Sequence, residues 1–341
     1  MRKVLITLMI IYCGITIFPE KVADLPELNK PHAIECDGEN FYILDETTVH
    51  VYSIEGCRHI RSFGQRGDGP YELVPMWFPI QLAVWDDKIM LSSLTKMVTY
   101  TKSGKPINEV VYHQIYRNLI PFQKNYVAVM EATDDKPLVS SYKTLLISSD
   151  FKNKTTLLAF SSPPLGARDG KQGFTLPLYT FIRVINNNLY VFSMQHDNEI
   201  FVFNTEGKEI RRLKVNLPRV KVTESVKKDL VDYLKSIRYY KRMKLNEEDL
   251  ESHVFLRDYL PTVRLFHIKN GIIYLQTHVK KGKDYQYVLM DLNGKILRTL
   301  FLPMNLYEIN YQGSFCFDKN TYYYLVDNDE SENWELHKVT F

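Results

Sequence analysis

One short unit occurs six times along this chain: an apolar strand, a polar turn of two or three residues, and a second apolar strand. The six copies are Ile34 to Asp45, Leu82 to Ser93, Leu119 to Met130, Phe181 to Ser193, Leu265 to Thr277 and Ser314 to Asp327. Their turns are rich in Asn, Asp and Gly, which tolerate the positive φ angles of tight hairpins. Each copy therefore predicts an antiparallel β-hairpin.

A second hairpin follows most copies of the unit. These second hairpins run from Val49 to Gly64, Met97 to Tyr112, Glu199 to Val215 and Gln286 to Leu302, with a looser example from Lys143 to Phe160. Two hairpins together make a sheet of four antiparallel strands. Aromatic residues form 13% of the chain, including 23 Tyr and 18 Phe, and such rings pack well on strands.

A four-stranded sheet repeated six times cannot bury both of its faces alone, but radial packing around an axis covers every face. We therefore expect an all-β fold, a six-bladed β-propeller formed as one domain by residues 21–341. The last unit supplies only three strands and ends with Trp334 to Phe341, so we expect a strand near Lys21 to Leu25 to complete it and close the ring. A β-sandwich of many hairpins is the alternative, which the six in-phase repeats disfavour.

One segment between the fourth and fifth units departs from the strand pattern. Residues Thr223 to Met243 carry apolar side chains at helical spacing, with most Lys and Arg opposite. Asn246 then stands as an N-cap before an acidic first turn, and Pro261 ends the run. We expect a helical hairpin insertion over residues 223–260. Its basic stripe is either a solvated face or a contact for an acidic partner or for membrane head groups.

The N-terminus has the features of an export signal. Arg2 and Lys3 precede an apolar run from Val4 to Phe18 that is too short to span a bilayer comfortably. We expect residues 1–20 to be a signal peptide or a lipoprotein signal, with Cys13 as the candidate lipidated residue. A buried N-terminal strand is the alternative. If residues 1–20 are such a signal, the mature protein is exported to the periplasm or lies at the outer membrane.

Three further cysteines, Cys36, Cys57 and Cys316, have no metal-ligand spacing. A disulfide between Cys36 and Cys57 is compatible with an oxidising compartment. Three buried, unpaired thiols are the simpler interpretation.

A glycine-rich loop, FGQRGDGPYEL from Phe63 to Leu73, joins the first unit to the second. Within it, Gly64, Gly67, Gly69 and Pro70 predict a tight, fixed backbone. The loop is therefore expected to connect the outer strand of one blade to the inner strand of the next.

With Glu72, these residues occupy the places of a motif written FG-x-x-G-x-GP-x-E. In this motif the chain resembles the exported six-bladed β-propeller proteins of Bacteroidetes, many of which are lipoproteins related in architecture to NHL-repeat propellers. Tyr71 departs from the Gly often found between the Pro and the Glu. The resemblance covers nearly the whole mature chain. It implies an extracytoplasmic propeller and supplies no catalytic residues.

The same loop offers the candidate ligand contacts. Consecutive glycine amides form a nest for an anion, and Arg66 adds positive charge. Connections between blades share a face with the turns that join second and third strands. We therefore expect the loop and the helical insertion on one face, with Arg66, Asp68 and Tyr71 near any ligand bound there. A purely structural connector is the alternative.

No linear catalytic motif is present, because the sequence lacks HExxH, GxSxG, CxxC and Walker patterns. Its histidines are scattered, and the acidic turn from Asp327 to Glu332 lacks the Gly and closing acid of a calcium loop. Trp77, Trp85 and Trp334 are candidates for stacking on a sugar, although Trp85 ends an inner strand and is expected in the core. With 43 Lys+Arg against 40 Asp+Glu, a nucleic-acid partner is not expected.

Two functions fit these features. The first is a non-enzymatic binding or scaffold module that recognises a peptide, glycan or protein partner through its loop-bearing face and needs no cofactor. The second is a metal-dependent hydrolase or lactonase, in which carboxylates from several blades hold a divalent metal that activates water. Because such convergence leaves no linear motif, the absence of motifs weakens the case for the second function but does not exclude it.

Overall fold

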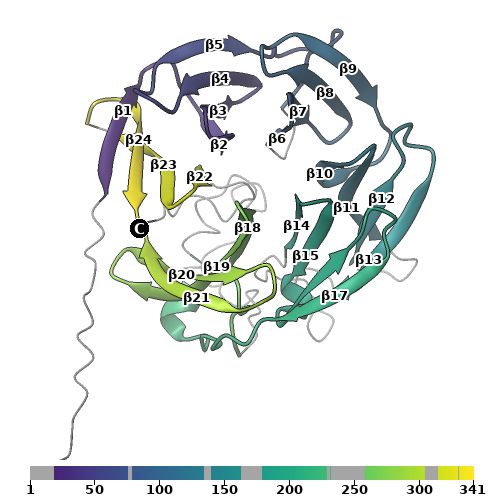
Figure 1. Cartoon of the computed structure of the whole chain (residues 1–341), viewed down its shortest axis with the longest axis vertical. Helices are drawn as coiled ribbons and strands as arrows, with labels where there is room; N and C mark the ends of the chain where they lie inside the picture. The colour runs from purple at the N-terminus through teal and green to yellow at the C-terminus, as the bar shows by residue number, and fades with distance from the viewer. Residues whose placement is uncertain are drawn as a thin grey trace, which may run out of the picture.

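The computed structural model describes residues 19–75, 79–133, 140–162, 179–228, 231, 258–303, 314–328 and 330–341. Their strands form six four-stranded antiparallel sheets arranged around one axis (Figure 1). Each sheet is one blade, so the predicted six-bladed β-propeller is confirmed.

In the first five blades the strands follow the chain order from the ring axis outward. Blade 1 holds β2 (Pro31–Cys36), β3 (Asn40–Asp45), β4 (Thr48–Ser53) and β5 (His59–Phe63), and blade 2 holds β6 (Gln81–Trp85), β7 (Lys88–Ser92), β8 (Lys96–Thr101) and β9 (Pro106–Val111). Blade 3 holds β10 (Tyr116–Phe122), β11 (Asn125–Thr133), β12 (Ser140–Ile147) and β13 (Lys154–Ser162). Blade 4 holds β14 (Thr180–Ile185), β15 (Asn188–Ser193), β16 (Glu199–Phe203) and β17 (Glu209–Lys214), and blade 5 holds β18 (Leu265–Lys269), β19 (Ile272–Lys281), β20 (Asp284–Asp291) and β21 (Ile296–Leu302).

Blade 6 is built from both ends of the folded chain. Its three inner strands are β22 (Phe315–Asp318), β23 (Thr321–Asn328) and β24 (Asn333–Thr340), and its outer strand is β1 (Glu20–Leu25). Strand β1 pairs antiparallel with β24. The strand expected near Lys21 to Leu25 therefore closes the ring.

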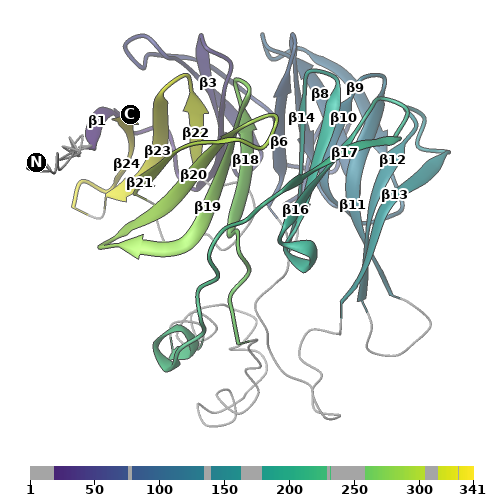
Figure 2. The same cartoon turned by 60° about the horizontal axis from the view of Figure 1, so that its bottom comes forward.

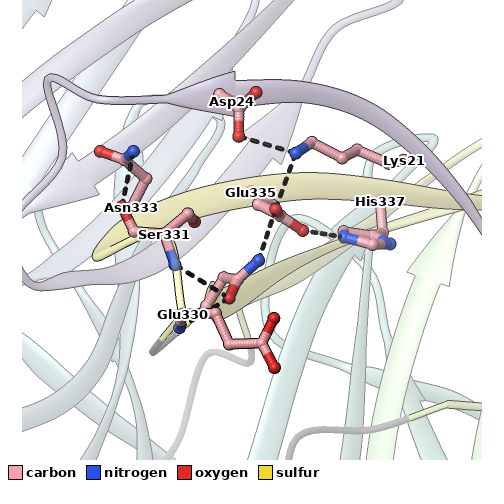
Figure 3. Close-up of polar contacts among 8 residues, drawn as sticks. Lys21, Asp24, Glu330, Ser331, Asn333, Glu335 and His337 are labelled. Carbon is pink, nitrogen blue, oxygen red and sulfur yellow. Dashed lines mark hydrogen bonds and ion pairs between the residues drawn. The ribbon is translucent and has the colours of Figure 1, made fainter.

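A group of polar side chains joins β1 to the other strands of blade 6 (Figure 3). Lys21 Nζ lies 2.8 Å from Asp24 and 2.7 Å from Glu335 Oε1, which also accepts from Asn328 at 2.8 Å. The second oxygen of Glu335 lies 2.7 Å from His337 Nε2. Hydrogen bonds from Lys21, His337 and Asn328 lower the pKa of Glu335 to about 2. We call this group the closure clasp.

Hydrophobic side chains are buried between neighbouring blades. In the described part of the chain they form six clusters, each with members from two adjacent blades. Between blades 5 and 6, for example, the rings of Tyr274 and Phe317 stack with their centroids 3.8 Å apart. Because the strands alternate side chains between two faces, each blade can contribute to both of its junctions.

Several predictions fall on residues that the structure does not describe. Residues 1–18, which include Cys13, lie outside the described part of the chain, as does most of the helical hairpin predicted over 223–260. At the start of that segment, residues 224–228 are helical, and η1 (Met194–His196) is a short 3-10 turn. None of the helices described has the length and apolar character needed to cross a membrane.

Cys36, Cys57 and Cys316 are all buried and unpaired. The structure therefore contains no disulfide between Cys36 and Cys57, and it holds the three buried thiols in their reduced form.

Candidate functional site

The strand order defines two faces of the ring. Each time the chain moves on to the next blade it enters at the inner strand, from β2 in blade 1 to β22 in blade 6, so the six inner strands run in the same direction. Connections between blades and turns between second and third strands lie on one face, which we call the loop face. Turns between first and second strands lie on the other, which we call the hairpin face. Figure 2 shows η1 and the helix at residues 224–228 below the blades, on the loop face.

The glycine loop is held together by its own polar groups. Gly67 N donates to Leu73 O at 3.2 Å, and Leu73 N donates to Gln65 O at 2.9 Å. Gly69 N donates to the Glu72 carboxylate at 2.8 Å. The amides of Gly67 and Gly69, which the anion nest would need, therefore already have acceptors within the loop.

Two glycines allow close approaches that a side chain would block. Gly64 has φ +92°, and a Cβ there would lie 2.4 Å from the carbonyl oxygen of Thr47 in the β3–β4 turn. Gly67 has φ +155°, and its Cβ would lie 2.1 Å from the Glu72 carboxylate. Both contacts require glycine, at positions 64 and 67, so the local geometry explains why the motif has glycine at these two places.

The tip of the loop is anchored to blade 2. Lys96 Nζ donates to Gly69 O at 2.8 Å and lies 3.0 Å from the Glu109 carboxylate. Tyr71, at φ +62°, donates its amide hydrogen to Glu109 and accepts from the Tyr100 hydroxyl at 2.9 Å through its carbonyl oxygen. The main chain of the tip is therefore fixed against strands β8 and β9.

The three predicted ligand residues form an exposed patch on the loop face. Arg66 is exposed and lies 3.5 Å from the Glu46 carboxylate. Asp68 is exposed, and Tyr71 is 40% exposed. The structure keeps these side chains on one loop and does not bury them around a small ligand.

A different set of polar side chains lies on the inner strands. It comprises Glu35 on β2, Arg183 on β14, and His267 and Lys269 on β18. We call these residues the axial cluster. Each lies at or beyond the middle of its strand, so the cluster is nearer to the hairpin face than to the loop face. The axial cluster and the predicted loop residues are therefore not brought together.

An electrostatic effect links side chains of two opposite blades. Glu35 belongs to blade 1 and Arg183 to blade 4, across the ring from each other (Figure 1). Burial lowers the pKa of Arg183 below its usual value, and the Glu35 carboxylate acts in the opposite direction. Because such an effect weakens with distance, the two side chains are near enough to act on each other across the ring.

Arg183 and His267 present adjacent hydrogen-bond donors. Arg183 Nε donates to His267 Nδ1 at 3.4 Å, and Arg183 Nη1 donates to the carbonyl oxygen of Ile182 at 2.9 Å. Because Nδ1 accepts a hydrogen bond, neutral His267 carries its proton on Nε2. His267 is only 6% exposed, and its Nε2 is buried with no partner in the described part of the chain. An acceptor from outside the chain would satisfy this donor.

The charges of the cluster follow from its surroundings. Burial lowers the pKa of His267 well below its usual value, and Arg183 and Lys269 lower it further, so the imidazole is neutral near pH 7. Burial also acts to lower the pKa of Lys269, but Glu35 and other negative groups outweigh it, and the pKa is raised. Lys269 Nζ donates to the carbonyl oxygen of Cys36. The cluster therefore holds two cations, one neutral donor and one carboxylate.

This donor set suits an anionic oxygen better than a metal ion. A guanidinium edge beside an imidazole N–H can donate to both oxygens of a carboxylate. A divalent cation at the same place would be repelled by Arg183 and Lys269. Over the whole described part of the chain, no group of three or more His, Cys, Asp or Glu side chains is arranged to hold a metal.

The tryptophans lie away from this cluster. Trp85 is half-buried and packs against the core between blades 2 and 3. Trp334 donates from its ring nitrogen to the carbonyl oxygen of Asn29 at 3.1 Å. Trp77 falls outside the described residues.

Sequence reasoning missed the axial cluster, although one signal for it exists. A charged or ionisable residue interrupts three otherwise apolar inner strands: Glu35 in AIEC, Arg183 in FIRV, and Lys269 in FHIK. A charge in a half-buried strand is costly unless it faces solvent or a partner. The three positions come close together only when the closed ring brings the inner strands around one axis.

Comparisons with known proteins support the fold. No family model matches the sequence, and no curated protein matches it. Among solved structures, the chain is similar to a protein from Bacteroides fragilis to which export has been attributed, with a TM-score of 0.55 and 14% identity over 95% of this chain and 94% of the other. It also aligns with the WD40 domain of Neurospora crassa Pan2, with a TM-score of 0.43 and 8% identity over 94% of this chain and 95% of the other. At 14% identity the likeness to the Bacteroides fragilis protein extends to the fold alone.

Proposed function

We propose that this propeller is an exported, non-enzymatic binding module that holds a carboxylate-bearing ligand at the axial cluster. The observation that carries the proposal is the contact between Arg183 and His267: in the described part of the chain the guanidinium touches no carboxylate, and the His267 Nε2–H has no acceptor. Lys269 adds positive potential on the same side of the cluster. A carboxylate would accept from both donors at once.

Glu35 narrows the ligand class further. Its carboxylate faces Arg183 from the opposite blade, and none of its described contacts is an ion pair or a hydrogen bond. A ligand that places hydroxyl or ammonium donors on the far side of its carboxylate would satisfy Glu35 as well. Acidic sugars and peptide C-termini share this chemistry, and both belong to the glycan and peptide ligands that the sequence suggests.

Export rests on the N-terminal signal features and on the resemblance to exported propellers. Lipidation of Cys13 would attach the protein to a membrane. Finding the protein in the membrane fraction, and losing it from that fraction in the Cys13→Ser variant, would support that part of the proposal. Arg66, Asp68 and Tyr71 are proposed as contacts for a macromolecular partner on the loop face, because their side chains are exposed while the main chain beneath them is fixed.

Metal-dependent hydrolysis is the weaker alternative. It needs several carboxylates or imidazoles converging on one ion. The axial cluster offers one carboxylate and a buried neutral imidazole beside two cations, and this set disfavours a divalent ion.

The proposal is tested by comparing free acids with their neutral derivatives. Glucuronate, galacturonate and a short peptide with a free C-terminus are each titrated into the protein by calorimetry, with the methyl ester or amide of the same compound as the control. At least one acid is expected to bind. Its neutral derivative is expected to bind at least about tenfold more weakly, which is the value of one charge-assisted hydrogen bond. The sugar and peptide arms identify the source of the carboxylate.

Two variants locate the site. Arg183→Met is expected to weaken binding of the acid by about tenfold or more. Arg61→Met is the matched control, because Arg61 is exposed on the outer strand β5 and donates a long hydrogen bond of 3.4 Å to the Lys102 carbonyl oxygen. Equal binding of acid and ester, or unchanged binding by Arg183→Met, would contradict the proposal.

A further inference from the structure

The junction between blades 6 and 1 is where the two ends of the folded chain meet. Cys36 is the last residue of β2 in blade 1, and Cys316 is the second residue of β22 in blade 6. Both are 1% exposed and belong to the same hydrophobic cluster. Residues that stand far apart along the sequence are thus packed side by side on two neighbouring inner strands.

The two thiols lie close together. Cys36 Sγ donates at 3.2 Å to the carbonyl oxygen of Phe317, the residue after Cys316 in the chain, and the Cys36 thiol helps to raise the pKa of Cys316. Around them, Phe41 and Tyr323 meet edge to face with their centroids 4.8 Å apart. Packing therefore also joins β3 and β23, the second strands of the two blades.

We propose that Cys36 and Cys316 form a disulfide in the mature exported protein, which joins the first blade to the last. The bond would close the ring covalently at the junction where β1 and β24 already close it by hydrogen bonding. It differs from the Cys36–Cys57 pairing considered from the sequence, since Cys57 lies in the same cluster but the groups that act on its thiol do not include Cys36.

The reaction balances by thiol–disulfide exchange with a disulfide oxidant. The thiolate of one cysteine attacks the oxidant and releases one thiol, leaving a mixed disulfide. The second cysteine then displaces the second thiol, so the protein loses two protons and two electrons, which leave with the two thiols of the oxidant. Burial raises the pKa of Cys316 well above its usual value, and the Cys36 thiol raises it further. The folded reduced protein should therefore react slowly, and the bond should form while the chain folds.

The test compares one protein sequence in two redox states. The purified chain is denatured under reducing conditions and refolded either with reduced and oxidised glutathione or with reductant alone. Free thiols are alkylated, the disulfides are then reduced, and the new thiols are alkylated with a second reagent before peptide mapping. Cys36 and Cys316 are expected to carry the second label and Cys57 the first.

A melting comparison measures the consequence. The disulfide closes a loop that includes almost the whole ring, so the oxidised protein is expected to melt about 5 °C or more above the reduced protein. Cys57→Ala should retain this difference, while Cys316→Ser should remove it. First-label alkylation of all three cysteines after oxidative refolding, a cross-link between Cys36 and Cys57, or equal melting temperatures of the two redox states would overturn the proposal.

Discussion

The glycine loop and the axial cluster lie toward opposite faces of the same ring and use their polar groups in opposite ways. In the loop, the amides of Gly67 and Gly69 and the carboxylate of Glu72 bond to one another or to neighbouring main chain. In the cluster, no carboxylate among the described residues contacts the guanidinium of Arg183 or the Nε2–H of His267. The comparison teaches that the most specific linear motif of the chain builds the scaffold, whereas the groups suited to a ligand are distributed one or two to a blade.

The largest expected effect is on the loop. Gly64→Ala should destabilise the protein by about 2–4 kcal/mol, because the residue has φ +92° and the new Cβ would meet the Thr47 carbonyl oxygen at 2.4 Å. Gly38→Ala is the matched control, since Gly38 has φ +94° with nothing within 4 Å, and it should cost about 1 kcal/mol. Urea unfolding of the two variants measures the difference, and equal losses would show that the loop is not tightly packed.

A fully paired carboxylate elsewhere in the ring provides a pH test. The folded-state pKa of Glu335 is depressed to about 2, so its contribution to stability is present above its usual pKa of about 4.5 and is lost as the pH falls from there toward 2. Glu335→Gln should lower the melting temperature by about 2–5 °C near pH 7 and flatten its decline in that acid range. An unchanged acid profile in this variant would mean that the closure clasp does not hold β1 against β24.

Arg183 should behave in the opposite way to Glu335. Arg183→Met replaces a desolvated cation that has no ion pair in the described part of the chain, so the melting temperature should stay the same or rise by about 1–3 °C. Thermal melts without ligand measure this. A large fall would identify Arg183 as a structural residue and would remove the contrast between the two regions.

The smallest effect is expected at the exposed patch. Arg66→Ala removes an exposed ion pair with Glu46 at 3.5 Å and should change the stability by less than about 0.5 kcal/mol. It should also leave binding of a small acid unchanged, as measured by calorimetry. If this variant lost the acid, the ligand would belong to the loop face.

The architecture could be predicted from the sequence because its signals are local. Six hairpins with Asn, Asp and Gly turns, and a last unit of only three strands that needs a fourth from near Lys21 to Leu25, are enough to define six sheets and their closure. The close contact of Gly64 with Thr47 is local as well, because Thr47 lies in the β3–β4 turn of blade 1 and Gly64 follows β5 of the same blade.

The axial cluster could not be predicted in this way, because its members are joined only by the closed ring. Glu35 and Arg183 come from opposite blades, and His267 looks like any scattered histidine until its buried Nε2 is seen beside Arg183. The thiols of Cys36 and Cys316 are adjacent for the same reason. Contacts across the ring depend on how the blades pack together, which no linear spacing encodes.

The most direct test of the axial cluster is nitrogen-15 NMR of the His267 imidazole in the free protein and with the acid that binds best. Near pH 7 the account predicts a neutral ring protonated on Nε2, whose Nε2 resonance shifts when the acid is added, while the exposed His59 does not respond. A ring protonated on Nδ1, or an Nε2 resonance that stays unchanged at saturating acid, would contradict it.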